Sequence, residues 1–189
     1  MKDIEIRLIS ELMKNSRRSD RQLGKALGVS QPTVSRTIKR LEKEGVIREY
    51  TVIPDFNKLG FDIMSISFAK LKEPVSEQKL VEVRKQVHEV LQTVPKTIVL
   101  AQSGDGLGAE RVVIAFHKSY SAYSRFAHRL KLHPLVAVEE IKSFLIDLNY
   151  RNEYLPLTFS ELAHSLTSTE FQENQGRARK NIRDKERTP

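Results

Sequence analysis

The sequence predicts an α+β protein, in which an N-terminal (winged) helix-turn-helix precedes a ferredoxin-like βαββαβ domain. Three observations carry this prediction. Residues 19–45 hold two short amphipathic segments separated by a glycine turn. Residues 63–148 alternate strand-like and helix-like patterns in the order βαββαβ. Hydrophobic residues make up 39% of the 189 positions, which is enough to build real cores.

The first two helices are marked by periodicity and capping signals. Apolar residues recur at helical spacing over residues 2–14. Ser19, with Gln22 three positions later, is a capping box for a second, short helix. Gly24 supplies a small residue where two helices must touch. Gly28 follows in the turn, where a left-handed conformation is needed and a Cβ atom is costly.

The third helix begins after Ser30 or Gln31, and Pro32 stands in its first turn, where a missing N–H does no harm. Its core face has the spacing i, i+4, i+7, and the opposite face is rich in basic residues. The core residues are Val34, Ile38 and Leu41, and the basic residues are Arg36, Lys39, Arg40 and Lys43. Gly45 ends the helix.

The charge of this motif indicates a polyanionic partner. The net charge is +8, and residues 1–50 alone carry 12 basic and 7 acidic side chains. A capped helix-turn-helix with a basic outer face is typical of proteins that place one helix in the major groove of double-stranded DNA. An ordinary three-helix bundle with a solvated basic face remains the alternative.

The candidate DNA-binding residues follow from their place on the third helix. Residues at its N-terminal end reach base edges, whereas basic residues further along it, and those that flank the second helix, meet phosphates. Arg36 suits a guanine and Gln31 an adenine. The full set is Gln31, Thr33, Ser35, Arg36, Lys39, Arg40, Arg18 and Arg21.

The remaining elements divide the chain into domains. Residues 46–53 alternate enough to form a strand that serves as a wing or connector. Strands are then expected at 63–71, 97–101, 111–116 and 136–148, with helices at 76–92 and 119–132. The predicted divisions are 1–50 (helix-turn-helix DNA-binding domain), 51–62 (connector strand and loop), 63–150 (ferredoxin-like domain) and 151–189 (a C-terminal extension, partly disordered).

A sheet with helices on one face leaves the other face to be buried, so we expect a homodimer or a higher oligomer. The candidates for this burial are Ile98, Leu100, Val113 and Ile114, although core packing explains them equally well. In the extension, an apolar patch over residues 154–162 predicts a small helix that packs on the sheet or on a partner subunit.

These features together resemble the Lrp/AsnC (feast/famine) transcription regulators. The resemblance covers residues 3 to 150 and rests on LGKALGVSQPTVSRTIKRLEKEGVI, the connector YTVIPDFNKLGF and the βαββαβ unit. It implies a DNA-binding dimer, which often assembles further, and an effector site near the loop that joins the middle strands. That loop holds Gly104, Asp105 and Gly106. It lacks the aromatic residue usual in members that sense amino acids, so a plain hairpin is the alternative.

Other functions find less support. The absence of Cys excludes disulfides and thiolate metal sites, and no signal segment or membrane-length apolar run is present, so we expect a cytoplasmic protein with no membrane association. The spacing of His117, His128 and His133 does not suit a metal, and GDGLG lies between strands rather than before a helix, so no cofactor is expected.

Two alternatives to a regulator stay open. Siroheme decarboxylase subunits share this architecture, and such an enzyme subunit would need catalytic histidines at a tetrapyrrole pocket. A partner-binding module that has lost contact with DNA is the other. The basic recognition helix favours a regulator that is not an enzyme and that acts with or without a small-molecule effector.

Overall fold

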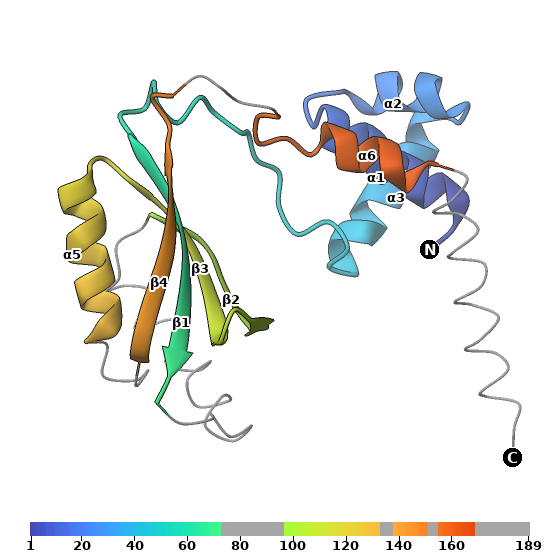
Figure 1. The fold of residues 1–189 in the computed structure, drawn as a ribbon. Helices are drawn as coiled ribbons and strands as arrows, with labels where there is room; N and C mark the ends of the chain where they lie inside the picture. The colour runs from blue at the N-terminus through green and yellow to red at the C-terminus, as the bar shows by residue number, and fades with distance from the viewer. Residues whose placement is uncertain (73–96, 133–137, 151–154, 169–189) are drawn as a thin grey trace, which may run out of the picture. The chain divides into compact units, whose positions relative to one another are not determined.

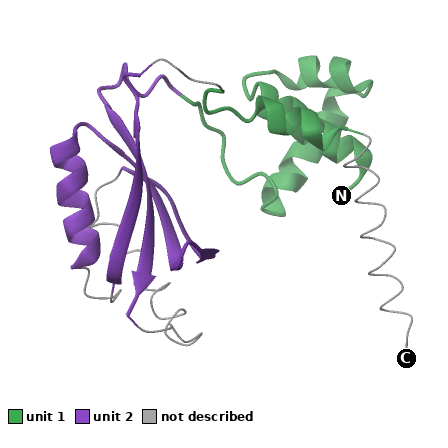
Figure 2. Ribbon diagram, viewed as in Figure 1, with its two compact units in different colours: residues 1–53, 154–189 green, residues 54–153 purple. Residues whose placement is uncertain are grey.

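The computed structural model describes residues 1–72, 97–132, 138–150 and 155–168. The chain forms two compact units, which Figure 2 colours separately. Unit 1 contains residues 1–53 together with the C-terminal segment from Tyr154, and unit 2 contains residues 54–153. Each unit has a hydrophobic core of its own.

Unit 1 is helical. Its elements are α1 (Asp3–Lys14), α2 (Asp20–Leu27), α3 (Gln31–Lys43) and α6 (Ser160–Leu166) (Figure 1). The three helices predicted near the N-terminus are thus confirmed. Their apolar faces meet in one cluster of buried side chains, formed by Leu8, Leu23, Leu27, Val34 and Leu41.

The C-terminal extension contributes a helix to this unit. The hydroxyl of Ser10 in α1 donates a hydrogen bond of 2.8 Å to the carbonyl oxygen of Ala163 in α6. Both residues are buried, with exposed fractions of 1% and 0%. The helix expected in this region therefore exists, but it packs on α1 rather than on the sheet. Residues 169–189, part of the predicted extension, lie outside the described residues.

The strand expected at residues 46–53 is not formed. Hydrogen bonds from the N–H groups of Val46 and Ile47 to the carbonyl of Leu41 instead close the end of α3. Ile47 then packs against the helical core, while Val52 is 74% exposed. Alternating apolar residues form a stable strand only when a second strand supplies hydrogen bonds, and no described segment pairs with this one.

Unit 2 is an antiparallel sheet in the order β2-β3-β1-β4. Its strands are β1 (Ile63–Leu71), β2 (Ile98–Gly106), β3 (Ala109–His117) and β4 (Val138–Asp147), and α5 (Tyr120–Lys131) covers one face (Figure 1). This order agrees with the predicted ferredoxin-like domain. The helix expected at 76–92 lies outside the described residues.

The two faces of the sheet differ in their packing. Val113 and Ile98 belong to the cluster beneath α5, which also contains Phe126. Leu100 and Ile114 are paired neighbours on the opposite, open face. Two of the four residues predicted for burial against a partner, Ile98 and Val113, are therefore ordinary core, because side chains alternate between the faces of a strand.

The open face is apolar along its middle row. Ile66 in β1 lies opposite Ile114 in β3 and Phe144 in β4. Phe144 is 66% exposed and Leu100 is 39% exposed. At one end of this face, Phe116 is covered by Phe56, whose ring stacks on it at a centroid distance of 3.9 Å.

Candidate nucleic-acid interface

Two glycines set the geometry of the turn between α2 and α3. A Cβ atom at Gly24 would lie 2.7 Å from the carbonyl oxygen of Val29 and 3.5 Å from the backbone nitrogen of Gln31. Gly28 ends α2 with φ of 72°, the left-handed conformation that favours glycine. The glycine at 24 is thus required by a close approach to the turn itself, and the glycine at 28 by a positive φ.

Side-chain caps hold the start of each helix. The Ser19 hydroxyl accepts a hydrogen bond from the Gln22 N–H, and the Gln22 side chain accepts one from the Ser19 N–H at 2.8 Å. In α3 the Ser30 hydroxyl accepts from the Thr33 N–H. The predicted capping box is confirmed, and the cap of α3 is Ser30 rather than Gln31. Each cap satisfies an N–H group that would otherwise lack a partner.

The buried side of α3 is fixed by Val34 and Leu41, which are 1% and 0% exposed. This anchoring leaves Gln31, Arg36 and Lys39 exposed to solvent. Among the described residues, Arg36 and Lys39 have no ion-pair partner, and the Arg36 Nε donates only to the Pro32 carbonyl oxygen at 3.3 Å. The charges of Arg36 and Lys39 are therefore available to an external anion.

The other predicted residues near the start of α3 are less exposed to solvent. Thr33 and Ser35 are half-buried, and the Thr33 hydroxyl is hydrogen-bonded to that of Ser30 at 2.8 Å. On α2, Arg21 and Lys25 are exposed.

Arg40 is committed to two carboxylates. Its guanidinium lies 2.6 Å from Glu5 of α1 and 3.0 Å from Glu44 at the end of α3. Glu5 is 4% exposed and also accepts a hydrogen bond of 2.8 Å from the Lys2 N–H. That N–H and the guanidinium lower the pKa of Glu5 against the opposing effect of its burial. Arg40 therefore ties α3 to the start of α1.

Arg18 is also paired within the unit. Its guanidinium bonds to Glu11, which forms a second ion pair with Lys14 at 2.9 Å. The sequence signal for the Arg40–Glu44 pair was present in its i, i+4 spacing. The Arg18–Glu11 pair joins α1 to the loop that follows it, and the Arg40–Glu5 pair joins α3 to α1, so spacing within one helix could not reveal them.

The segment predicted to hold an effector is the tip of a tight hairpin. Gly104, Asp105 and Gly106 form the exposed end of β2, and Gly106 pairs with Ala109 at the start of β3. The turn is made by Leu107 and Gly108, with φ of 54° and 68°. Positive φ at both central residues is typical of a two-residue hairpin turn, so Gly108 has a structural role in this turn.

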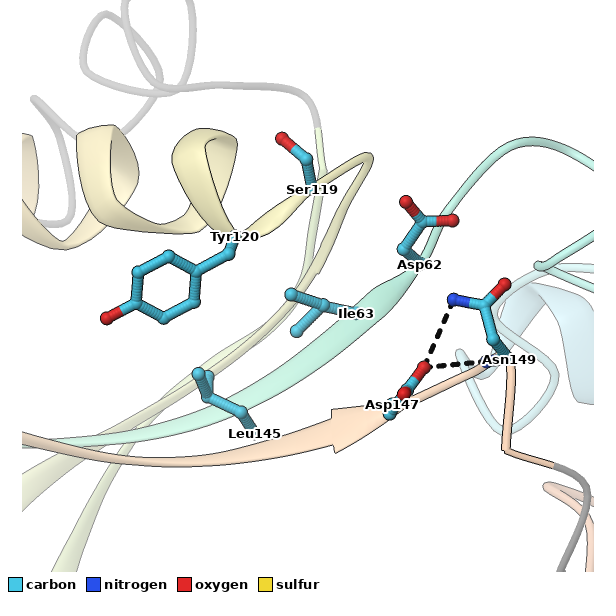
Figure 3. A pocket seen from close by; sticks show the side chains of 7 residues that line it. All are labelled: Asp62, Ile63, Ser119, Tyr120, Leu145, Asp147 and Asn149. Carbon is cyan, nitrogen blue, oxygen red and sulfur yellow. Dashed lines mark hydrogen bonds between the residues drawn. The ribbon is translucent and has the colours of Figure 1, made fainter.

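A pocket of about 300 Å³ lies at the opposite end of the sheet (Figure 3). It is lined by Asp62 and Ile63 at the start of β1, by Tyr120 of α5, and by Asp147 and Asn149 after β4, together with Ser119 and Leu145. The Asp147 carboxylate accepts two hydrogen bonds from Asn149, from the backbone N–H at 2.9 Å and from the side chain at 3.1 Å. This pocket and the hairpin are therefore separate places.

The histidines do not gather into a metal site in the described part of the chain. His117 is buried beneath α5, where its Nε2 lies 2.8 Å from the Ser65 hydroxyl and its ring packs on Tyr123 and Phe126. Burial lowers the pKa of His117. His128 is exposed on α5, and His133 lies outside the described residues.

Comparisons with known proteins agree with the helix-turn-helix geometry. The family model for winged helix-turn-helix DNA-binding domains matches residues 1–48. The HTH-type transcriptional regulator LrpC of Bacillus subtilis is 39% identical over 69 residues, which cover 36% of this chain and 48% of LrpC. The regulator Ptr1 of Methanocaldococcus jannaschii is 28% identical over 143 residues, covering 76% of this chain and 89% of Ptr1. The matched segment thus spans about half the length of the first of these relatives.

Solved structures extend the similarity to both units. The structure of Bacillus subtilis LrpC matches with a TM-score of 0.60 at 27% identity and covers 77% of this chain and 94% of that one. A Neisseria meningitidis regulator, NMB0573, solved as a complex with L-Met, matches with a TM-score of 0.63 over 86% of this chain and 99% of its own. At 16% identity that match supports the fold alone.

The class is therefore a helix-turn-helix unit joined to a ferredoxin-like sheet. Within that class, the chain is similar to regulators of the Lrp/AsnC family, and the relatives named above are transcription regulators rather than siroheme-decarboxylase subunits. None of the helices in the described ranges has the length and hydropathy needed to cross a bilayer.

Proposed function

We propose that this protein is a sequence-specific DNA-binding regulator of transcription. One observation carries the proposal: α3 is held by caps and buried apolar residues on one side and presents Gln31, Arg36 and Lys39 to solvent on the other. Proteins with this motif place the corresponding helix in the major groove, where its N-terminal residues contact base edges.

The proposal gives the exposed residues separate roles. Arg36 and Gln31 contact bases, since guanidinium and amide groups pair in bidentate fashion with guanine and adenine. Lys39 and Arg21 contact phosphates, which fixes register and supplies salt-dependent affinity. Thr33 and Ser35 lie beside them.

Arg18 and Arg40 remain predicted phosphate contacts, but their internal ion pairs reduce the charge that they offer to DNA. We therefore give them less weight than Arg36 and Lys39, and assign to Arg40 the additional role of positioning α3.

The working form in this proposal is a homodimer or a higher oligomer. The open face of the sheet exposes Leu100 and Phe144, and a second copy would remove that apolar surface from water. Half-sites about one helical turn apart, in a roughly palindromic operator, would match the two-fold symmetry of such a dimer.

The proposal also includes an effector and a location. The hairpin tip at Gly104, Asp105 and Gly106 remains the predicted effector contact. The Neisseria protein NMB0573, which has a similar fold, was solved as a complex with L-Met. A protein that binds chromosomal DNA would work in the cytoplasm. No cofactor or enzymatic activity is part of the proposal.

Selection of bound sequences from random DNA, followed by gel-shift assays on the selected site, tests this function. Arg36→Ala is expected to weaken binding to the selected site by about 1–3 kcal/mol and to relax specificity at one base pair. Equal weakening on every sequence would make Arg36 a phosphate contact, and failure to select any sequence would overturn the proposal.

A further inference from the structure

A hollow of about 630 Å³ lies within unit 1 and has no role in the function proposed above. Its walls come from the C-terminal end of α1, from residues 46–53 after α3, and from residues 158–162 at the start of α6. All of these segments belong to the same compact unit. The volume falls within the range of about 300–1,000 Å³ that is common for sites that bind small molecules.

Exposed apolar side chains surround this hollow. Val46, Tyr50, Phe159 and Leu162 all line it, and their exposed fractions lie between 41% and 53%. Large apolar side chains are normally buried, and a concentration of exposed ones around a concave site favours a ligand with an apolar body.

The charged groups at the hollow favour an anion. Arg17 and Arg48 line it, and neither forms an ion pair with a described residue. Lys14, a third lining cation, is neutralised by Glu11 at 2.9 Å. Glu49 is the acidic lining residue. Unpaired guanidinium groups beside an apolar wall suit the carboxylate of an amphipathic molecule.

The hollow is connected to the recognition helix by hydrogen bonds. The N–H groups of Val46 and Ile47 bond to the Leu41 carbonyl of α3 at 2.9 and 3.2 Å. The Tyr50 hydroxyl donates to the Glu42 carboxylate of α3 at 3.0 Å. Tyr50 is about half exposed, and its partial burial, together with Glu42, raises the pKa of its phenol to about 12.

We propose that this hollow is a binding site for a small organic carboxylate with an apolar body, and that occupancy changes the DNA affinity of α3. The carboxylate meets Arg17 and Arg48, and the apolar body lies against Val46, Phe159 and Leu162. The second half of the proposal rests on the proposed DNA-binding function, whereas the binding site itself does not.

One wall of the site comes from the C-terminal segment of unit 1. Residues 158–162 form this wall, and α6, which begins at Ser160, holds them in place. The hydrogen bond from Ser10 to Ala163, with both residues buried, anchors α6 to α1. The site is therefore distinct from an effector site on the sheet unit.

Binding of a carboxylate in the hollow is tested by titrating the full chain with phenylbutyrate while recording backbone amide NMR signals. Shifts are expected at residues 46–53 and 158–162, and phenylbutylamine, which has a similar apolar body but the opposite charge, should bind at least about fivefold more weakly. Arg48→Gln should weaken phenylbutyrate binding about two- to fivefold, whereas Arg125→Gln on α5 should leave it unchanged. Val52→Trp, at a lining position that is 74% exposed, should obstruct the site without unfolding the unit.

Two results would overturn the binding site. One is the absence of shifts at residues 46–53 in a titration that reaches millimolar phenylbutyrate. The other is equal binding of the amine and the carboxylate, which would remove the assigned role of the arginines.

The effect of ligand occupancy on DNA affinity is tested with the selected DNA site. Saturating phenylbutyrate should change the DNA affinity of the full chain at least about threefold. Glu42→Ala, which removes the acceptor of the Tyr50 hydrogen bond and does not line the hollow, should keep phenylbutyrate binding but lose this effect. Phenylbutyrate binding without any change in DNA affinity would overturn the coupling. Absence of DNA binding by the ligand-free protein would overturn the proposed function and leave the NMR titration as an independent test of the site.

Discussion

Replacing Gly24 by alanine tests whether the turn between α2 and α3 is packed as closely as the structure shows. The new Cβ atom would lie 2.7 Å from the Val29 carbonyl oxygen, whereas ordinary C···O contacts lie at about 3.3–3.6 Å. The backbone of the turn would have to withdraw by about 0.6 Å or more. Overpacking of this kind costs about 1–3 kcal/mol, and the better helix propensity of alanine offsets about 1 kcal/mol of that cost.

The expected result for Gly24→Ala is a net loss of stability of about 0–2 kcal/mol, with a larger effect on DNA binding because the start of α3 moves. Thermal unfolding followed by circular dichroism, combined with gel-shift titration, measures both effects. Gly28→Asn is the matched control: a Cβ atom there meets nothing within 4 Å, and asparagine tolerates the φ of 72°. If Gly24→Ala were more stable than the parent and bound DNA equally well, the close approach at this position would be refuted.

Three further predictions concern protonation and assembly. The Lys2 N–H and Arg40 lower the pKa of Glu5 in the folded protein. The ionised Glu5 therefore contributes its full stability above the ordinary pKa near 4.5, and this contribution is lost as the pH falls through the lowered pKa of the folded state. Glu5→Gln should flatten this part of the profile of melting temperature against pH. Burial lowers the pKa of His117, so the sheet unit should lose stability as the pH falls below about 6.5, and His117→Gln should remove this loss; an unchanged profile would contradict the assignment. Phe144→Glu on the open face should reduce the molar mass measured by light scattering to that of a monomer, whereas Tyr120→Glu, at a position equally exposed on α5, should not.

Local signals predicted the helix-turn-helix well. Ser19, Gln22 and Gly28 act over three or four residues, and the spacing of Val34 to Leu41 defines one face of one helix, so no distant contact was needed to interpret them. The four strands were predicted in their correct order for the same reason, although β2 and β3 continue further toward the hairpin than their apolar residues indicate.

The incorrect predictions involve partners that are distant in the sequence. Residues 46–53 alternate like a strand, but no described segment pairs with them, and Ile47 packs on helices instead. The pairing of Arg40 with Glu5 joins residues 35 positions apart, so a helical wheel places Arg40 on the free face without revealing that its charge is partly neutralised. The packing of α6 on α1 depends on Ser10 and Ala163, whose separation of 153 positions leaves no local pattern.

The residues that would contact DNA stay predictions, because the fold determines which side chains are exposed but not which of them touch DNA. Ion pairing nevertheless divides the predicted basic residues in a way that charge alone did not. Arg36 and Lys39 are unpaired with any described residue, and Arg18 and Arg40 are paired. The unpaired charge of Lys39 can therefore be tested directly against DNA.

That test is the salt dependence of DNA affinity for the parent protein, Lys39→Ala and the control Lys118→Ala, an exposed lysine of the sheet unit. Each phosphate contact contributes about 0.9 to the slope of log affinity against log salt concentration. Lys39→Ala is expected to reduce the slope by about 1 for each protomer bound, while Lys118→Ala leaves it unchanged. Affinity that is independent of salt, or an identical slope for all three proteins, would contradict the claim that the exposed basic face of α3 binds DNA.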